Sequence, residues 1–413
     1  MVSLFGLFAI VGLAWLMSSH RRKVPWRVVG WGMGIQLFFG LFVLKTAWGQ
    51  WIFAGLNDAV VKLLSFTNEG SEFIFGAYVS KEFSFALNVL PTIIFFSSFM
   101  AIFYHLGIMQ RIVSGLSWAM QKTMKTSGSE TLSASANIFV GQTEAPLVVK
   151  PFINTMTRSE LNVVMVGGFA TVAGGVLAAY VQMLKDTFPD IAGHLIAASV
   201  MSAPAAVVIA KVMLPETEES KTAGGASLTV EKIDANIIDA AARGAGEGLK
   251  LALNVGAMLL AFLALVAMIN YLIGAPVEIY NHFAGTDHAP LTLELILGWL
   301  FWPLALLMGV PPEDCSTIAT LLGEKLVLNE FVAYGHLGEL LNDPENKLRY
   351  RSVVIATYAL CGFANFGSIA IQIGGIGAIA PERRSDLARL GFRAMLGGML
   401  AACMTATIAG ILV

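Results

Sequence analysis

Long apolar runs, separated by short polar stretches, dominate this chain. Several of them reach or approach the roughly 20 residues that a helix needs to cross a bilayer. The runs span residues 4–17, 28–46, 85–104, 161–184, 191–214, 249–273, 353–379 and 387–413. This pattern predicts an all-α polytopic membrane protein with about eight transmembrane helices.

Two further apolar stretches, residues 127–154 and 311–341, are interrupted by glycine and polar residues. Each is long enough for two short helices, which is typical of a re-entrant hairpin whose tip faces a water-lined cavity. A span that is itself interrupted follows each hairpin: residues 161–184 contain FATVAGGV, and residues 350–379 contain FANFGSIA. Both octets read Phe-Ala-polar-hydrophobic-small-small, so we expect two broken helices.

The order of these elements is the same in residues 85–214 and 249–413, and the predicted orientation of the two copies is opposite. We therefore expect an inverted repeat, and paired broken segments of this kind indicate a transporter's binding site near the membrane midplane. Residues 1–84 fall outside the repeat and read as peripheral scaffold helices, with an interfacial helix near 51–75. The polar residues 215–248 read as a cytoplasmic linker.

Composition and charge agree with this interpretation. The chain is 56% hydrophobic and only 13% charged, and its three cysteines show no metal-type spacing. Basic residues at 20–27 and 382–389 place both termini outside by the positive-inside rule, whereas the basic stretch 346–351 does not fit. No basic block suits a nucleic acid, so that partner is excluded.

Two glutamates within the hairpins are the main candidates for chemistry. Asp, Lys or Arg at the bilayer centre costs on the order of 2.5–3.5 kcal/mol, so ionisable groups retained there usually serve a function. Glu144 lies in the first hairpin and Glu330 in the second, with Lys325 five residues before it. Carboxylates and amides suit a neutral polyol-like or amide-bearing ligand, or a small cation. Glutamates paired to structural donors, and a glycosidase-like carboxylate pair, are the alternatives.

Four motifs together resemble the concentrative nucleoside transporters. They are GQTEAPL (141–147), IDAAARGAGEGLKLALNVGAMLLAFLAL (238–265), NEFVAY (329–334) and GFANFGSIAI (362–371). The resemblance covers the chain from about residue 30. It implies a homotrimer in a bacterial cytoplasmic membrane, with a scaffold and a transport region in each protomer. It also implies nucleoside uptake coupled to sodium or protons, with no other cofactor.

The resemblance also assigns roles to residues. It implies that the first hairpin and its break hold the base, and that the second hairpin and its break hold the ribose. The base contacts would be Gln142, Thr143, Glu144, Val176 and Phe363, and the ribose contacts Glu330, Asn365 and Ser368. Independently, Asn365 and Ser368 are three residues apart and would share one face of a helix.

A sodium site is implied at the first hairpin. Its ligands would be the Asn137 and Thr171 side chains and the carbonyls of Val140 and Val172. The proton-coupled branch of the family tends to read GQSE and to lack the asparagine, which favours sodium here. Thr171 and Gly367 depart from the serines common at their positions. Asn137 could instead cap a helix, and Thr171 could bond to a carbonyl of its own helix.

The function expected from the sequence is sodium-coupled symport of nucleosides, with pyrimidine nucleosides such as uridine mildly favoured. A proton-coupled symporter is the main alternative. A channel or a membrane enzyme acting on nucleosides is less favoured, because the site lies in opposed hairpins and the chain has no candidate water-exposed catalytic domain.

Overall fold

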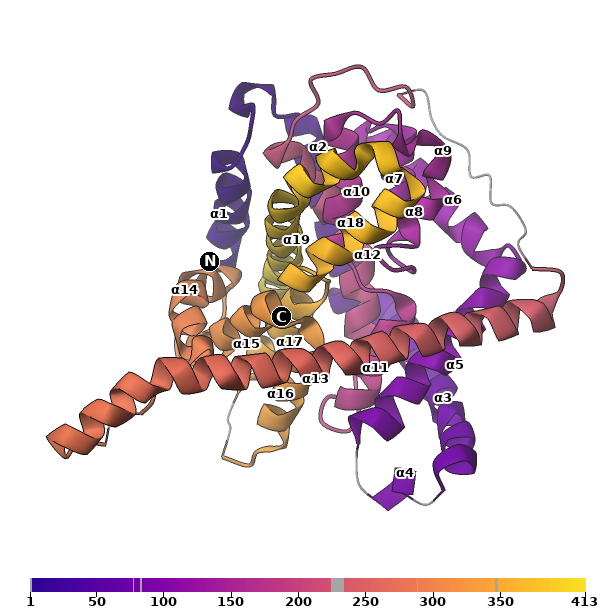
Figure 1. The fold of residues 1–413 in the computed structure, drawn as a ribbon. Helices are drawn as coiled ribbons and strands as arrows, with labels where there is room; N and C mark the ends of the chain where they lie inside the picture. The colour runs from indigo at the N-terminus through magenta and orange to yellow at the C-terminus, as the bar shows by residue number, and fades with distance from the viewer. Residues whose placement is uncertain (1, 77, 82–83, 224–233, 288, 346–347) are drawn as a thin grey trace.

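The structure, a computed structural model, describes the whole chain except residues 1, 77, 82–83, 224–233, 288 and 346–347. In this described part every regular element is a helix (Figure 1). The all-α class predicted from the sequence is therefore confirmed for these residues.

The helices follow one another with short connections. The first group is α1 (Val2–Leu16), α2 (Trp26–Lys45), α3 (Ala47–Phe75) and α4 (Tyr78–Lys81). The second is α5 (Leu90–His105), α6 (Ile108–Met124), α7 (Gly128–Ala136), α8 (Ala145–Val148), α9 (Lys150–Ile153), α10 (Arg158–Ala170), α11 (Gly174–Leu184) and α12 (Ile191–Met213). The third is α13 (Ile237–Ala284), α14 (Leu293–Met308), α15 (Cys315–Val327), α16 (Glu330–Asn342), α17 (Tyr350–Leu360), α18 (Phe366–Ile379) and α19 (Arg384–Leu412).

Among the described residues, six helical segments are long and apolar enough to cross a membrane. They are Trp26–Lys45, Phe85–His105, Arg158–Leu184, Ile191–Met213, Ile237–Ala284 and Pro381–Leu412. The helices α1, α14 and α18 are also apolar but shorter. The predicted count of about eight spans stays a prediction, because length alone does not assign these shorter helices to the bilayer.

The helix α13 is longer than the sequence pattern predicts. It begins at Ile237, inside the expected linker 215–248, because the Asn236 side chain accepts a hydrogen bond from the Asp239 backbone N–H and caps the helix. The predicted span 249–273 is therefore the middle of a single 48-residue helix. The apolar α14 and the amphipathic α6 are further helices that the pattern of long apolar runs does not predict.

Both stretches predicted as hairpins consist of short helices joined by non-helical chain. In the first, a capping box of Ser127 and Glu130 starts α7, and residues 137–144 leave the helical path before α8 and α9. In the second, α15 ends at Val327 and α16 begins at Glu330, where the Asn329 side chain accepts a hydrogen bond from a backbone N–H. The hairpin tips therefore carry the polar motifs.

The two predicted helix breaks lie against each other in the interior. The chain leaves the helix between α10 and α11 at residues 171–173, and between α17 and α18 at residues 361–365. Gly362 has φ +123°, and a Cβ there would lie 2.7 Å from the Phe169 carbonyl oxygen at the end of α10. Only glycine combines this φ with so close an approach.

Buried charges anchor the base of the first hairpin. The Lys211 ammonium of α12 lies 2.7 Å from Glu130 of α7 and 3.3 Å from Glu216 beyond the end of α12. Glu160 of α10 accepts hydrogen bonds from the hydroxyls of Ser220 and Thr222 in the following connection. A buried cation held by two carboxylates fixes α7 and α12 together, because separating them would leave charges unpaired.

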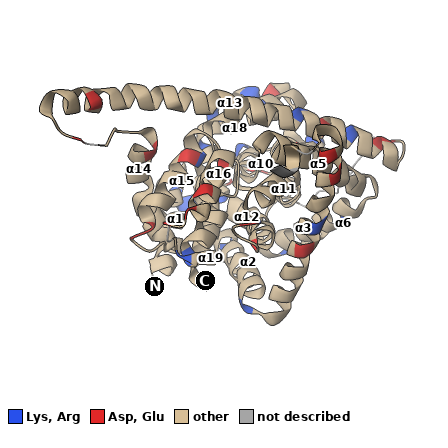
Figure 2. Cartoon of the chain, turned by 90° about the horizontal axis from the view of Figure 1, so that it is seen from below, with Lys and Arg blue, Asp and Glu red and all other residues tan. Residues whose placement is uncertain are grey.

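The long helix α13 runs along the outside of the bundle (Figures 1 and 2) and is clamped to α5. A Cβ on Gly248 would lie 2.8 Å from the Ile94 Cα, and one on Gly244 would lie 2.7 Å from the Ser97 carbonyl oxygen. Glycines four residues apart let two helix backbones approach this closely within a membrane.

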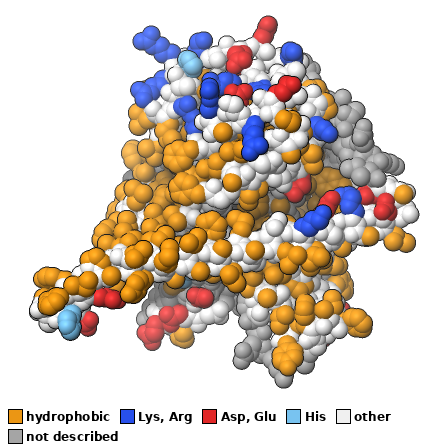
Figure 3. Space-filling model, viewed as in Figure 1, with side chains coloured by type: hydrophobic (Ala, Val, Ile, Leu, Met, Phe, Trp, Pro, Cys, Tyr) orange, Lys and Arg blue, Asp and Glu red, His pale blue; other side chains and the backbone are white. Residues whose placement is uncertain are grey.

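Charge is distributed unevenly over the surface. Figure 3 shows lysine and arginine side chains gathered at one end of the face in view, above a broad hydrophobic area. The connection between α1 and α2 lies at that end, and both chain termini lie away from it (Figure 1). Arg349 and Arg351 of the exceptional basic stretch have local partners, because Arg349 pairs with Glu313 at 3.4 Å and Arg351 donates to the Gly309 carbonyl.

Candidate functional site

A buried polar cluster lies where the tip of the second hairpin meets the break between α17 and α18. Glu330, the first residue of α16, is only 2% exposed. The Tyr180 hydroxyl of α11 donates to its Oε1 at 3.0 Å, and the Asn365 amide donates to its Oε2 at 2.9 Å. Each carboxylate oxygen has one donor and retains a lone pair for a further hydroxyl.

Asn365 is oriented by its place at the start of α18. Its Oδ1 accepts a hydrogen bond from the Ser368 backbone N–H at 2.8 Å, which caps the helix. The cap commits the carbonyl half of the amide and leaves the NH2 group directed at Glu330. The predicted proximity of Asn365 and Ser368 is observed, although Asn365 precedes the helix and does not lie on its face.

The tip of the first hairpin reaches the same place from the other side. Gln142 donates from Nε2 to the Ser368 hydroxyl at 3.0 Å and accepts from Gln372 Nε2 at 3.1 Å. One hydrogen-bonded chain thus joins the two hairpins across the molecule. We call it the polar chain; its members are Tyr180, Glu330, Asn365, Ser368, Gln142 and Gln372.

The two residues after Gln142 lie at the edge of this cluster. Thr143 packs so closely on Gly375 of α18 that a side chain at that glycine would collide with it. Glu144 is exposed, and its carboxylate is folded back over Gly141. Among the described residues it forms no ion pair, and it takes no part in the polar chain.

The two predicted apolar contacts are both buried near the breaks. Val176, 2% exposed, lies in the first turn of α11, and Phe363, 9% exposed, lies in the break before α18. Their positions flank the polar chain in sequence and leave apolar surface beside its hydrogen-bonding groups. Their contact with a base stays a prediction.

The two side chains predicted to bind an ion, those of Asn137 and Thr171, both lie beside Gly167 of α10. Asn137 is fully buried, and neither polar atom of its side chain has a hydrogen-bond partner in the described residues. A Cβ on Gly167 would lie 3.0 Å from the Asn137 Nδ2, and the Thr171 hydroxyl donates to the Gly167 carbonyl at 2.8 Å.

This donor set fits a small hard cation. No hydrogen bond among the described residues uses the carbonyl oxygens of Val140 or Val172, the two backbone ligands expected from the sequence. A buried amide without partners is costly, and an oxygen-seeking cation would satisfy the Asn137 carbonyl. Asn137 does stand at the C-cap of α7, through its backbone N–H, but its side chain takes no part in the cap, and Thr171 bonds within its own helix.

Lys325 is the cation closest in sequence to Glu330, and it is fully buried. Its ammonium donates to the Ala359 carbonyl in the last turn of α17, at 2.9 Å, and forms no ion pair with Glu330 within the part of the chain that the structure describes. The glutamate is therefore held by neutral donors, and its remaining lone pairs can accept hydrogen bonds from the hydroxyl groups of a ligand.

Two members of the polar chain were missed by motif reasoning. Tyr180 lies four residues after Val176, and Gln372 lies four residues after Ser368, so each falls on the same helix face as a predicted contact. Both sit in apolar helices outside the recognised motifs. A search for polar residues at this spacing beyond each motif would have found them.

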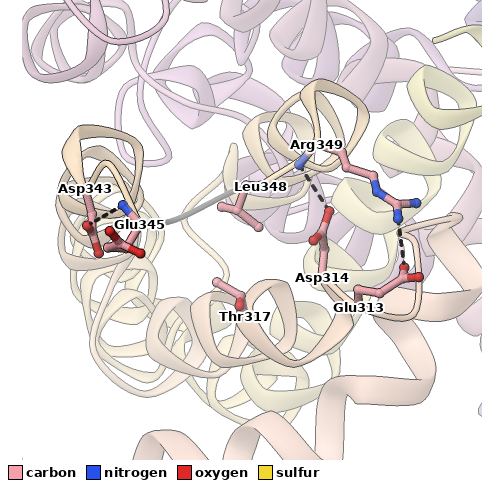
Figure 4. Close-up of a pocket in the computed structure, with 7 residues that line it drawn as sticks. All are labelled: Glu313, Asp314, Thr317, Asp343, Glu345, Leu348 and Arg349. Atoms are coloured by element: carbon pink, nitrogen blue, oxygen red, sulfur yellow. Dashed lines mark hydrogen bonds and ion pairs between the residues drawn. The ribbon is translucent and has the colours of Figure 1, made fainter.

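A surface hollow lies apart from these residues. It lies at the base of the second hairpin, opposite the tip that carries Glu330, and has mostly acidic walls (Figure 4). Its lining residues are Glu313, Asp314, Thr317, Asp343, Glu345, Leu348 and Arg349. Its carboxylates are partly committed to Arg349 and Ser352, so we do not assign a ligand to it.

Three family models match the chain. The model described as Na+ dependent nucleoside transporter C-terminus matches residues 194–410. The corresponding N-terminus model matches residues 5–78, and the model described as Nucleoside recognition matches residues 86–187. The matches cover both hairpins and both helix breaks.

Individual proteins agree with the family models. Sodium/nucleoside cotransporter 1 of Mus musculus is 43% identical over the whole chain, which spans 64% of that protein's length. The uncharacterized transporter YutK of Bacillus subtilis is 44% identical, with 99% of this chain and 98% of YutK covered. The structure of CNTnw in an inward-facing substrate-bound state is 43% identical, with a TM-score of 0.91 over 100% of this chain and 98% of CNTnw.

Proposed function

The chain belongs to the sodium-dependent nucleoside transporter family, and from this premise we propose that it is a symporter that imports nucleosides with sodium. Members of the family are transporters and not enzymes, so the carboxylates are binding groups and no hydrolytic role is assigned to them. The movement we infer is alternating access, in which the two hairpins and broken helices pass a fixed scaffold.

The polar chain is the observation that carries the proposal. It presents a carboxylate, three primary amides and two hydroxyls along one buried chain of hydrogen bonds. A ribose offers hydroxyls that can donate to the remaining lone pairs of Glu330, which Tyr180 and Asn365 hold in place. A base offers an edge of donors and acceptors that can replace the bonds of Gln142. A nucleoside matches both halves.

Sodium is the coupling ion we propose, bound by Asn137, Thr171 and the carbonyls of Val140 and Val172. The support is the unpartnered Asn137 amide beside the first hairpin. Because Gln142 belongs to the same hairpin, an ion that orders this segment raises nucleoside affinity. By linkage, the nucleoside raises sodium affinity by the same factor.

Radiolabelled uridine uptake into proteoliposomes tests this function. We expect accumulation with an inward sodium gradient, and none when choline replaces sodium at constant pH. Accumulation that ignores sodium and follows an imposed pH gradient would favour the proton-coupled alternative. Saturable accumulation against a gradient distinguishes a transporter from a channel.

Three finer features belong to the proposal. We propose a preference for pyrimidine nucleosides, a homotrimeric assembly in the lipid bilayer of a bacterial cytoplasmic membrane, and both chain termini outside. The basic end of the molecule, which lies away from both termini, supports this orientation (Figure 3). Competition of uridine uptake by unlabelled purine nucleosides tests the preference.

A further inference from the structure

Gln372 is a fully buried amide in the apolar helix α18. Its Nε2 donates two hydrogen bonds, to Gln142 Oε1 and to the Met165 carbonyl of α10, both at 3.1 Å. Its own Oε1 has no partner in the described residues. Burying an amide in an apolar helix costs free energy unless the amide is hydrogen-bonded, so the two bonds of Nε2 fix where the NH2 group of Gln372 lies.

The Met165 carbonyl fixes the direction of this arrangement. A backbone carbonyl can only accept, so the side of the Gln372 amide that faces α10 must be its NH2 group. The second N–H of that group is directed at Gln142, which must therefore turn its Oε1 toward Gln372. The Nε2 of Gln142 is left on the opposite side, where it meets the Ser368 hydroxyl.

The Ser368 hydroxyl could bond to either end of the Gln142 amide, because a hydroxyl both donates and accepts. It therefore does not determine which end of that amide faces Gln372. The orientation of Gln142 is consequently set from the α10 side alone. Close packing preserves it: a Cβ on Gly168 would lie 2.8 Å from the Gln372 Nε2 and 2.9 Å from the Gln142 Cβ. Both amides are thus pressed against the α10 backbone.

We propose that Gln372 is a positioning residue that makes Gln142 present its N–H donors, and that it thereby biases the transporter toward bases with an acceptor at the contacted edge. This inference rests on the proposed function. Uracil carries a carbonyl oxygen on each side of its ring N3, whereas cytosine replaces one of them with an amine. Uridine and cytidine therefore differ in this polarity at nearly equal size.

The test is the ratio of the KM values for uridine and cytidine uptake in Gln372→Met, which keeps the side-chain length and removes the donor. In the wild type we expect a lower KM for uridine. In the variant the ratio should move toward one by about two- to tenfold, the size of one neutral hydrogen bond, with Vmax little changed. An unchanged ratio, or a wild type that prefers cytidine, would overturn the inference.

Two further variants separate positioning from packing. Gln36→Met removes a fully buried amide of α2 that lies outside the polar chain, and it should leave the ratio unaltered. In a Gln142→Met background, Gln372→Met should have no further effect on the ratio. An equal effect of Gln372→Met with and without Gln142 would show that Gln372 acts independently, against the proposal.

A second readout covers variants that fold but do not transport. The rise in Tm of the purified protein with uridine or with cytidine gives the same preference from binding alone. Failure of this inference is distinct from failure of the proposed function. A wild type that takes up no nucleoside refutes the function, whereas nucleoside uptake with an unchanged ratio in Gln372→Met refutes only the role of Gln372.

Discussion

The two hairpins with the helix breaks that follow them, residues 127–184 (the first half) and 311–379 (the second half), differ in how their polar groups are satisfied. In the second half, Glu330, Asn365 and Ser368 are bonded to one another or to neighbouring side chains. In the first half, Asn137 is just as deeply buried and its amide has no hydrogen-bond partner in the described residues.

Because of this difference, the Asn137 site can bind a ligand without losing a hydrogen bond, whereas the polar chain must rearrange its hydrogen bonds to do so. An unpartnered buried amide gains its first strong interaction when a cation arrives, with no bond to break. A nucleoside must instead displace the Ser368 hydroxyl that already accepts from Gln142. We therefore expect sodium to bind first and the nucleoside second, so that the order of binding follows from the hydrogen bonds.

The largest effect is expected when the negative charge of Glu330, in the second half, is removed. Glu330→Gln should lower uridine uptake by about 100-fold or more, because hydrogen bonds to a charged group contribute about 1.5–3 kcal/mol each and at least two are affected. Uptake into proteoliposomes measures the effect. Glu345→Gln, an exposed glutamate at the base of the same hairpin, is the control and should transport normally. Normal uptake by Glu330→Gln would remove it from the site.

Removing the unpartnered amide tests the first half. Asn137→Ala should raise the sodium concentration for half-maximal uptake by about tenfold, equivalent to about 1.4 kcal/mol. The sodium titration at saturating uridine gives the number. Asn162→Ala deletes another fully buried asparagine, one that donates to the Ala210 carbonyl, and should leave the titration in place. A shift of equal size in both variants would contradict a specific ion ligand.

The Tyr180 hydroxyl tests how much one donor to Glu330 contributes to nucleoside binding in the second half. Tyr180→Phe removes a donor to Glu330 and should raise the KM for uridine by about three- to tenfold. Tyr334→Phe is a close match, because its ring lies 4.4 Å from that of Tyr180 and its hydroxyl bonds to the Thr357 carbonyl instead. It should change stability and leave KM unaltered. Equal KM values in the two variants would place Tyr180 outside the site.

The smallest effect is expected at Thr171, whose hydroxyl is already bonded within its helix. Thr171→Val should raise the sodium requirement by about threefold, since the hydroxyl oxygen keeps lone pairs for an ion. Thr357 of α17 makes the equivalent bond to Val353 and has no proposed ion. The sodium titration of Thr357→Val should therefore match the wild type, and a similar shift in both would indicate a helix effect.

The sequence predicted the places where helices stop better than the places where they start. Thr171, Gly174 and Gly175 interrupt one apolar run and Gly362 and Asn365 interrupt the other, so both breaks could be located. The start of α13 depends on the Asn236 cap within a polar stretch, which hydropathy does not detect. The helix α14 is apolar after Glu294 in its first turn, but it is shorter than a typical span and lies directly before the second hairpin, so the pattern of long runs does not predict it.

The residues of the candidate site that belong to sequence motifs could be predicted, and the residues and contacts outside the motifs could not. Gln142, Glu330, Asn365 and Ser368 meet as the motifs suggested. The position of the Glu144 carboxylate over Gly141 depends on a local turn, and turns at irregular tips are not set by periodicity. The bond from Gln372 to the Met165 carbonyl joins α18 to α10, and such a long-range contact leaves no local pattern.

The length of α13 links this protein to the thickness of the surrounding bilayer. Its 48 residues form a helix about 72 Å long, more than twice the roughly 30 Å hydrocarbon core, so part of it must extend beyond the core or the whole helix must tilt. Gly244 and Gly248 bind it to α5, and Ser97 of α5 lies against Gly175 of α11. We therefore expect a change of acyl-chain length in the surrounding membrane to be felt, through α5, by the helix that carries Tyr180.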